Sequence, residues 1–136
     1  MIRFFIEDIN FKFLRKQEIK KWLTKVAVAE SKRVGEVSVI FCSDEHLLQI
    51  NRQYLQHDYY TDIITFDYTE DKLISGDLFI SVDTVKANAE EYKQAFDQEL
   101  HRVILHGVLH LCGYDDTNPQ QQKFMRAAED KYLNLL

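Results

Sequence analysis

Glycine and proline are scarce in this sequence, which has four glycines and one proline among 136 residues. Collagen-like and Gly/Pro-rich disordered chains are therefore excluded. No apolar run reaches the roughly 18 to 20 residues that a bilayer-spanning helix needs. The first residues, MIRFFIEDINF, carry acids where a secretory leader would carry basic side chains. We therefore expect a globular cytoplasmic protein without a membrane partner.

Cysteine is also rare, and its two positions have apolar surroundings. Cys42 ends the run VSVIFC, and Cys112 ends the run LHLC. Such neighbours favour reduced, buried thiols over a disulfide framework.

The chain lacks an overall excess of basic residues, with 17 Lys and Arg against 22 Asp and Glu and a net charge of −5. A uniformly basic nucleic-acid-binding protein is thus excluded. The charge is uneven, because residues 1–33 hold nine Lys and Arg against four Asp and Glu, a charge of +5, which leaves −10 for residues 34–136. A local basic face therefore remains compatible with the composition.

Hydrophobic periodicity and turn residues predict the order strand, helix, strand, helix, strand, strand, helix, helix, helix. Strands are expected at 2–8, 34–42, 62–68 and 73–82, the last two joined by a hairpin-type turn at 69–72. Helices are expected at 14–33, 43–54, 83–94 and 99–112 and from 118 onward. Ser43 and Asp97 are expected helix caps, and Asn118 with Gln121 forms a weaker capping box.

This order predicts one α+β domain over residues 1–136, with a central mixed sheet of about four strands and helices packed on it. The helix at 99–112 is apolar over most of its circumference. We therefore expect it in the core, as a zincin-like motif helix.

The segment HGVLHLCGYDD carries the residues best suited to chemistry. His106 and His110 project on the same side of a helix one turn apart, so they can bind one metal ion. Gly113 lets the chain leave the helix in a left-handed conformation, which can bring either Asp115 or Asp116 back toward the histidines. Two histidines and one carboxylate are a sufficient protein ligand set for catalytic zinc.

The spacing H-x3-H-x2-G-x2-D is in register with the metzincin pattern H-E-x-x-H-x-x-G-x-x-H. Gly107 replaces the glutamate base of that pattern, and Asp116 replaces its third histidine. Peptide hydrolysis by the usual zincin route therefore lacks its general base. A histidine pair on an apolar helix is by itself more often packing than metal binding, but the glycine exit and the two acids favour a metal site.

Other polar residues of this helix have local explanations. His101 lies about 180° around the helix from His110, so it is expected at the surface or in a supporting position. Arg102 either pairs with Glu99 or holds a phosphate, and the ion pair is favoured. Cys112 points away from the histidines and is not expected to be a ligand.

HGVLHLCGYDD resembles the signature H-G-x-L-H-L-x-G-Y-D-H of the YbeY family of bacterial ribosomal RNA maturation factors. INRQYLQHDYYTDIITFDY is similar to the family segment L-N-x-x-Y-R-x-K-D-x-P-T-D-V-L-S-F, and SGDLFIS resembles its strand G-D-I-x-I-S. The resemblance implies an α/β fold with a central sheet and the motif helix beneath a cleft. It also implies a zinc-dependent, single-strand-directed endoribonuclease that processes the 3′ end of small-subunit ribosomal RNA and serves ribosome quality control. Its implied partners are single-stranded ribosomal RNA, the small ribosomal subunit and ribosome-associated proteins.

Within this resemblance, His106 and His110 correspond to the first two metal histidines, and Asp116 takes the place of the third. Aspartate is a harder and shorter ligand than imidazole, so weaker zinc binding or another divalent ion is an alternative. Leu55 stands where the family has an arginine expected to contact RNA, and Arg52 lies nearby as a substitute. His57 and Tyr60 replace the family's lysine and proline, whereas Thr61, Asp62, Gly76 and Asp77 keep their places.

The candidate catalytic residues are Asp115 and Arg52. Asp115 orients a metal ligand or a water molecule, or it caps the helix exit. The nucleophile is either a water activated by the metal or the RNA 2′-hydroxyl. Four lysines either contact RNA phosphates or form a solvated basic face: Lys16, Lys20, Lys21 and Lys25. A non-catalytic ribosome-assembly factor and a zincin-like hydrolase of another substrate are the alternative functions.

Overall fold

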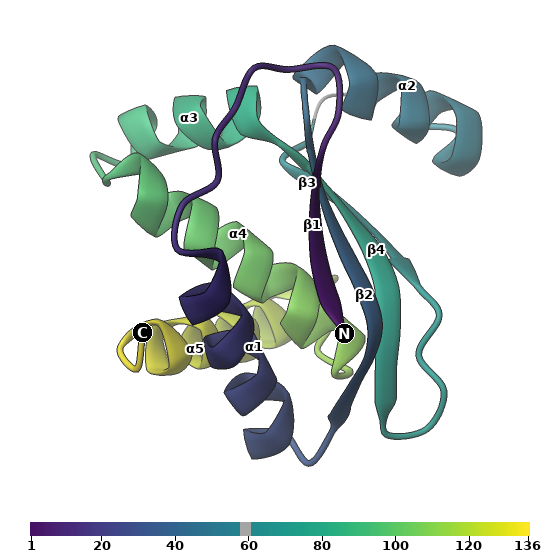
Figure 1. Ribbon diagram of the computed structural model, residues 1–136, viewed down its shortest axis with the longest axis vertical. Coiled ribbons are helices and arrows are strands. Elements are labelled where there is room, and N and C mark those ends of the chain that lie inside the picture. Colours follow the sequence, from purple (N-terminus) through teal and green to yellow (C-terminus); the bar gives the residue numbers. More distant parts are fainter. Residues whose placement is uncertain (58–60) are drawn as a thin grey trace.

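The computed structural model describes residues 1–57 and 61–136 (Figure 1). Its elements are β1 (Ile2–Ile6), α1 (Lys16–Ala29), β2 (Arg33–Cys42), α2 (Asp44–Leu55), β3 (Ile63–Asp67), β4 (Leu73–Ser81), α3 (Val82–Glu91), α4 (Phe96–Leu111) and α5 (Pro119–Leu133). The predicted α+β class and element order are confirmed. Tyr60, which replaces the family's proline, lies outside the described residues. None of the described helices is both long enough and apolar enough to cross a membrane.

The strands form one mixed sheet in the order β1-β2-β4-β3. β1 and β4 both run parallel to β2, and β3 pairs antiparallel with β4. A parallel pair needs a long crossover between its strands, and α1 supplies the one between β1 and β2. β3 is left at one edge of the sheet, where its outer side is available to border a pocket.

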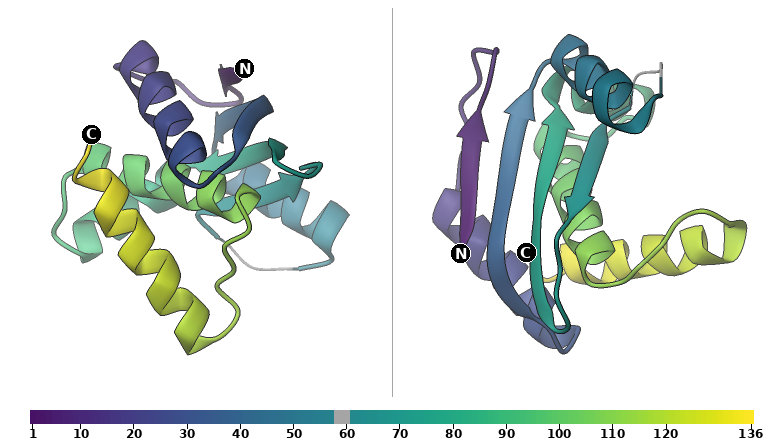
Figure 2. Two further views of the ribbon diagram at one scale, coloured as in Figure 1. Left: turned by 90° about the horizontal axis from the view of Figure 1, so that it is seen from below. Right: turned by 90° about the vertical axis from the view of Figure 1, so that its right-hand side faces the viewer.

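The core lies between one face of the sheet and the helices α1, α4 and α5. In the right-hand view of Figure 2, α1 and α4 lie behind the strands. Every second side chain of a strand points toward these helices, because successive residues of a strand face opposite sides of the sheet. α4 meets them with five residues that are at most 1% exposed: Leu100, Ile104, Leu105, Val108 and Leu109. The motif helix is therefore in the core, as predicted.

α2 lies on the other side of the sheet, at one end of it (Figure 1). Its residues Leu47 and Ile50 pack in a second, smaller apolar cluster with Cys42 and Ile64. The prediction of buried thiols is confirmed, since Cys42 and Cys112 are both free and buried. Burial raises the pKa of the Cys42 thiol to about 12.

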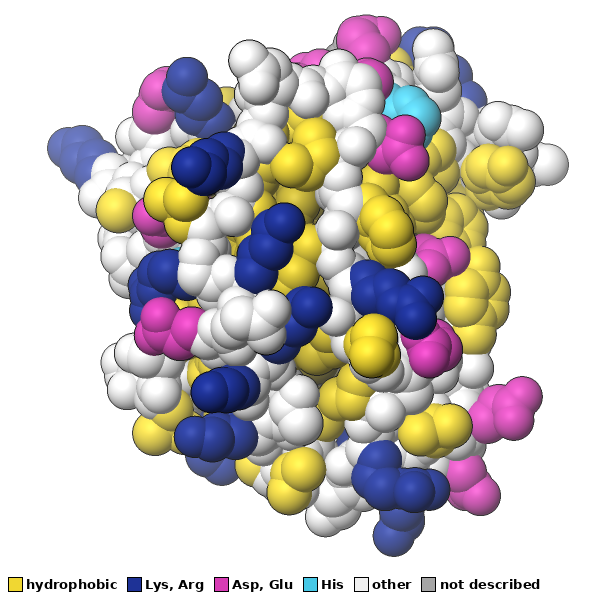
Figure 3. Space-filling view, viewed as in Figure 1, with side chains coloured by type: hydrophobic (Ala, Val, Ile, Leu, Met, Phe, Trp, Pro, Cys, Tyr) yellow, Lys and Arg dark blue, Asp and Glu magenta, His cyan; other side chains and the backbone are white. Residues whose placement is uncertain are grey.

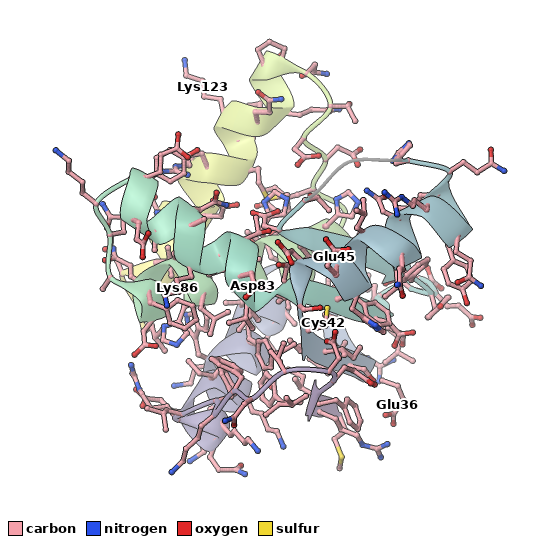
Figure 4. The ribbon with its side chains drawn as sticks, turned by 90° about the horizontal axis from the view of Figure 1, so that it is seen from above. Glu36, Cys42, Glu45, Asp83, Lys86 and Lys123 are labelled. Carbon is pink, nitrogen blue, oxygen red and sulfur yellow. The ribbon has the colours of Figure 1, made fainter. Side chains whose placement is uncertain are left out.

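The first turn of α2 is held by side chains from distant parts of the chain. Ser43 Oγ accepts a hydrogen bond from the His46 N–H, as the cap prediction requires. Ser43 also donates to the Asp8 carboxylate through its N–H and its hydroxyl, and the Asp44 N–H donates to Asp83. Figure 4 shows Asp83 at this end of the sheet, near Cys42. α2 is thereby tied to the segment after β1 and to the start of α3.

The N-cap of α4 and the capping box of α5 differ from the prediction. The N-cap of α4 is Ala95, without a side-chain cap bond, so Asp97 lies in the first turn and not at the cap. At that position its charge still suits the positive end of the helix. At α5, Asn118 accepts from the Gln121 N–H as expected. Gln121, however, accepts from the Thr117 N–H, one residue before the position that a capping box uses.

Candidate functional site

His106 and His110 lie on the same side of α4 and line one open pocket of about 510 Å³. The pocket lies between α4, the C-terminal turn of α2, the edge strand β3 and the loop that follows α4. Its lining residues are Asn51, Leu55, His57, Thr61, Asp62, Ile63, Ile64, Thr65, His106, His110, Asp116 and Thr117. The structure thus brings the motif together with the segment around β3, which the sequence places more than 40 residues earlier.

The chain leaves α4 by the predicted glycine reversal. Gly113 has a φ of +109°, a value that favours glycine, and its N–H donates to the His110 carbonyl. The reversed chain places Asp116 Oδ2 3.2 Å from His106 Nε2. Asp115 is exposed and does not line the pocket. Of the two acids, Asp116 is therefore the one that faces His106.

Gly107 occupies the position of the missing glutamate base, and the structure shows why no side chain stands there. A β-carbon at this position would lie 2.8 Å from Ile63 Cδ1 and 2.9 Å from Leu78 Cδ1. Real β-carbons essentially never come so close to another carbon. α4 approaches the sheet at this point, so a side chain here would require the ends of the Ile63 and Leu78 side chains to move.

The second ring nitrogen of His106 faces α5. His106 Nδ1 lies 2.7 Å from Glu129 Oε2, and Arg102 donates to Glu129 at 2.9 Å and to Asp130 at 2.7 Å. The favoured pairing of Arg102 with Glu99 is thus replaced by two ion pairs across the helix interface. Burial opposes a charge on His106, but the hydrogen bond to Glu129 and the charge of that carboxylate outweigh it and raise the pKa of His106.

Asp62 is a further acid at the site, just before β3. It lines the His106 pocket and a second polar pocket of about 300 Å³ that also contains His106 and Asp116. Burial raises the pKa of Asp62, although the charge of His106 and the N–H of Ile63 oppose this shift. This carboxyl group therefore keeps its proton to a higher pH than an ordinary aspartate, which makes it a candidate for proton transfer. From the sequence, Asp62 was only a position shared with the family pattern.

Two predicted residues lie away from the pocket. Arg52 is exposed on α2 and does not line the pocket, whereas Asn51 and Leu55 of the same helix do. Of the two positions expected for His101, at the surface or in support of the site, the surface is excluded, because the residue is only 6% exposed. Its ring meets Trp22 of α1 edge-on, with centroids 6.4 Å apart. The side of α4 opposite the pocket is covered by α1, and burial there lowers the pKa of His101.

The donor set suits a divalent cation. The 3.2 Å between His106 Nε2 and Asp116 Oδ2 is close to the separation of about 3.3 Å expected for two ligands of a tetrahedral zinc ion with bonds of about 2.0 Å. His110 Nδ1 is buried without a hydrogen-bond partner among the described residues, and a nearby ion or water is one explanation for such an atom.

The three predicted ligands, His106, His110 and Asp116, do not form a closed metal site in the structure. Across residues 1–57 and 61–136, no three His, Cys, Asp or Glu side chains lie close enough together to hold a metal ion. His110 lines the same pocket as His106 and Asp116.

The fold and the pocket together define a class of protein: a single α+β domain whose buried central helix presents two histidines and a facing aspartate beside an edge strand. The sequence profile of the family described as Endoribonuclease YbeY matches residues 3–136. This chain belongs to that family, as its three sequence segments predict.

Relatives called Endoribonuclease YbeY are similar over almost the entire chain. The protein from Phocaeicola vulgatus is 56% identical over 136 residues, which are 100% of this chain and 99% of that protein. The protein from Bacteroides thetaiotaomicron is 54% identical over 127 residues, or 93% of each chain. The solution structure of TM1509 from Thermotoga maritima superposes with a TM-score of 0.72 at 31% identity, over 98% of this chain and 87% of that chain. The predicted fold is therefore found in an independently determined structure.

Proposed function

We propose that this chain is a metal-dependent endoribonuclease that cuts single-stranded ribosomal RNA, in processing of the small-subunit RNA 3′ end and in ribosome quality control. The observation that carries the proposal is the 3.2 Å pairing of His106 Nε2 with Asp116 Oδ2 in an open pocket of a chain from the YbeY family. The relatives' name, Endoribonuclease, supports the type of reaction. Its partners under this proposal are the small ribosomal subunit and the associated proteins. We propose the cytoplasm as its compartment, in keeping with two unpaired cysteines.

Under this proposal, His106, His110 and Asp116 hold one zinc ion or another divalent cation. When bound, such a cation supplies Lewis-acid stabilisation for the charge that develops on the phosphoryl oxygens during cleavage. One oxygen ligand in place of a third imidazole makes the set harder than a three-histidine site. Manganese and other hard cations therefore compete better here than they would at three histidines.

The chain's own residues carry out the proton transfers and the positioning. Asp62 faces the pocket from the start of β3, where it can accept a proton from the attacking oxygen or return one to the leaving oxygen. Gly107, at the position of the metzincin glutamate base, has no side chain to share this work. Asp115, on the exposed side of the glycine reversal, orients Asp116 or caps the helix. Arg52 contacts RNA outside the pocket.

A cleavage assay on small-subunit precursor RNA tests the proposal. We expect the native protein to cut, the chelated protein to lose activity and added zinc to restore it. His110→Ala and Asp116→Ala should lose more than the about 10- to 100-fold that outer-sphere changes cost at metal sites. Asp115→Ala tests the ligand assignment: the metal content of the purified protein should fall in Asp116→Ala and hold in Asp115→Ala. Cutting that survives both chelation and His110→Ala would contradict the metal mechanism, and the reverse ranking of the two aspartates would move the ligand to Asp115.

The ends of the RNA products distinguish the two possible nucleophiles. Attack by the RNA 2′-hydroxyl leaves a 2′,3′-cyclic phosphate and a free 5′-hydroxyl, whereas attack by water leaves no cyclic phosphate. A substrate with a single 2′-deoxy residue at the cut position provides the control. Loss of cutting at that position alone identifies the 2′-hydroxyl as the nucleophile.

Leu55 favours a second candidate function, a ribosome-assembly factor that binds without cutting. This side chain lines the pocket at the place where the family pattern has an arginine, and it offers no charge to a phosphate. Association with the small subunit by metal-loaded protein that leaves precursor RNA intact would select this second function.

A further inference from the structure

α5 packs against α4 beside the candidate site (Figure 2). A chain of polar side-chain contacts joins the two helices. Arg102 donates to Asp130 Oδ1 at 2.7 Å and to Glu129 Oε1 at 2.9 Å. The other oxygen of the same carboxylate, Glu129 Oε2, lies 2.7 Å from His106 Nδ1. Arg102 and His106 are one turn apart on α4, and both therefore reach the same residue of α5.

Glu129 is an unusual place for a charge, because its side chain is only 5% exposed and that of Arg102 only 16%. A buried carboxylate is costly unless its oxygens are paired. Here one oxygen is paired with a guanidinium, which can only donate hydrogen bonds, and the other with the imidazole. Both oxygens are thus used, and the carboxylate has a defined orientation.

Both ring nitrogens of His106 face a carboxylate, Nδ1 that of Glu129 at 2.7 Å and Nε2 that of Asp116 at 3.2 Å. The contact to Glu129 is shorter, and its carboxylate is buried whereas that of Asp116 is partly exposed, so the geometry favours Nδ1 as the nitrogen that carries the proton of the neutral ring. A carboxylate held by Arg102 can only accept, and in this form of the ring His106 Nδ1 donates to it at 2.7 Å. In the neutral ring, Nε2 then carries the lone pair. That nitrogen is the one 3.2 Å from Asp116 Oδ2, on the side of the pocket.

We propose that Glu129, braced by Arg102, is the positioning residue that fixes His106 with its Nδ1 proton toward α5 and its Nε2 lone pair toward the pocket. The consequence for cation binding rests on the proposed function, since that function makes Nε2 a ligand atom. A ring fixed in this tautomer has its ligand atom prepared before a cation arrives. The orientation itself is a property of the metal-free protein and can be measured separately.

Asp130 provides a matched control for a merely structural bridge between the helices. It is the next residue of α5 and binds the same guanidinium at 2.7 Å, but its side chain is 56% exposed and, among the residues that the structure describes, bonds Arg102 alone. Asp130→Asn and Glu129→Gln are therefore the same chemical change at neighbouring positions. A structural bridge would be weakened by both variants, whereas positioning of His106 would be lost only in Glu129→Gln.

The first experiment measures the His106 tautomer in metal-free protein by two-bond nitrogen–proton couplings, at alkaline pH so that the ring is neutral. We expect wild type and Asp130→Asn to show a single Nδ1–H form and Glu129→Gln to show a mixture of forms. A wild-type His106 in the Nε2–H form overturns the proposal without any variant. An unchanged tautomer in folded Glu129→Gln also overturns it.

The second experiment measures zinc affinity by competition with a chromophoric chelator, with a thermal melt of each variant as the folding control. We expect Glu129→Gln to bind zinc about 10- to 100-fold more weakly than wild type and Asp130→Asn to bind it like wild type. Equal zinc affinity in wild type and Glu129→Gln overturns the cation part of the proposal, even where RNA is cut. If wild type binds no zinc and cuts no RNA, the proposed function fails, and the tautomer experiment still decides the role of Glu129.

Discussion

Gly107 lies on α4 between His106 and His110, at a point where the helix closely approaches the sheet residues Ile63 and Leu78. The sequence shows that a glutamate base is missing there, but it does not show the cause. The cause is packing, since an added β-carbon would lie 2.8 Å from Ile63 and 2.9 Å from Leu78. At the same place His106 and His110 line one pocket with residues of the edge strand β3.

Gly107→Ala is expected to destabilise the fold. Overpacking a well-packed core costs about 1 to 3 kcal/mol, and the better helix propensity of alanine returns about 1 kcal/mol, so we expect a net loss near 1 kcal/mol in urea unfolding. Ile63→Val removes the methyl group that the new β-carbon would meet. It should therefore cost less in the Gly107→Ala background than in wild type, and strictly additive losses would argue against the contact.

α2 is the element that closes the pocket opposite α4, with Asn51 and Leu55 on its inner side. Its position depends on its first turn, where Ser43 caps the helix and also binds Asp8. Three carboxylate or hydroxyl groups from three segments thus hold the N-terminus, which carries partial positive charge.

Ser43→Ala should loosen α2 selectively. Loss of an N-cap costs about 0.5 to 2 kcal/mol, and here the bond to Asp8 is lost with it. Hydrogen exchange should show faster exchange in α2 and unchanged protection in α5. Asn118→Ala, which removes the cap of α5, is the matched control and should show the opposite pattern. Uniformly faster exchange in both variants would mean that neither helix opens on its own.

The order of the elements could be predicted because each depends on local patterns: apolar residues at period 2 or 3.6, and capping residues at the helix starts. Ser43 and Asn118 were correctly predicted as caps for the same reason. The roles of Asp8 and Asp83 at α2 could not be found, since they lie 35 and 39 residues from their partners. Asp97 was wrongly predicted as a cap because Ala95, although a poor capping residue, already has the extended backbone of an N-cap.

Of the candidate site, only the part within the eleven residues 106–116 could be predicted from the sequence. The helical spacing of the histidines and the glycine exit are local, and they predicted that an aspartate returns to His106. Glu129 lies 23 residues after His106, and Asp62 lies 44 residues before it. No periodicity relates such positions. For the same reason Arg102, whose partners come from α5, was paired with a neighbour on its own helix.

On the scale of the whole molecule, the net charge differs between the N-terminal segment and the rest of the chain. Residues 1–33 carry +5 and the remaining residues −10, and Figure 3 shows Lys and Arg side chains gathered over α1 and the segment before it. A basic region on an acidic protein can attract a polyanion such as RNA. The same lysines can instead form a solvated face that binds no partner. The ionic-strength dependence of RNA binding distinguishes these two roles, because released counterions report the phosphates that are contacted.

We expect Gln substitution of Lys16, Lys20, Lys21 and Lys25 to weaken binding of non-cleavable 2′-O-methyl RNA and to flatten its salt dependence. For single strands, each phosphate contact contributes about 0.7 to the slope of log affinity against log salt. The control replaces four exposed lysines elsewhere, Lys72, Lys86, Lys93 and Lys123, two of which are labelled in Figure 4. Both sets change the net charge equally, so a general field would lower both slopes alike. A smaller slope in the α1 set alone would show that RNA contacts α1, and an unchanged slope would show a solvated face.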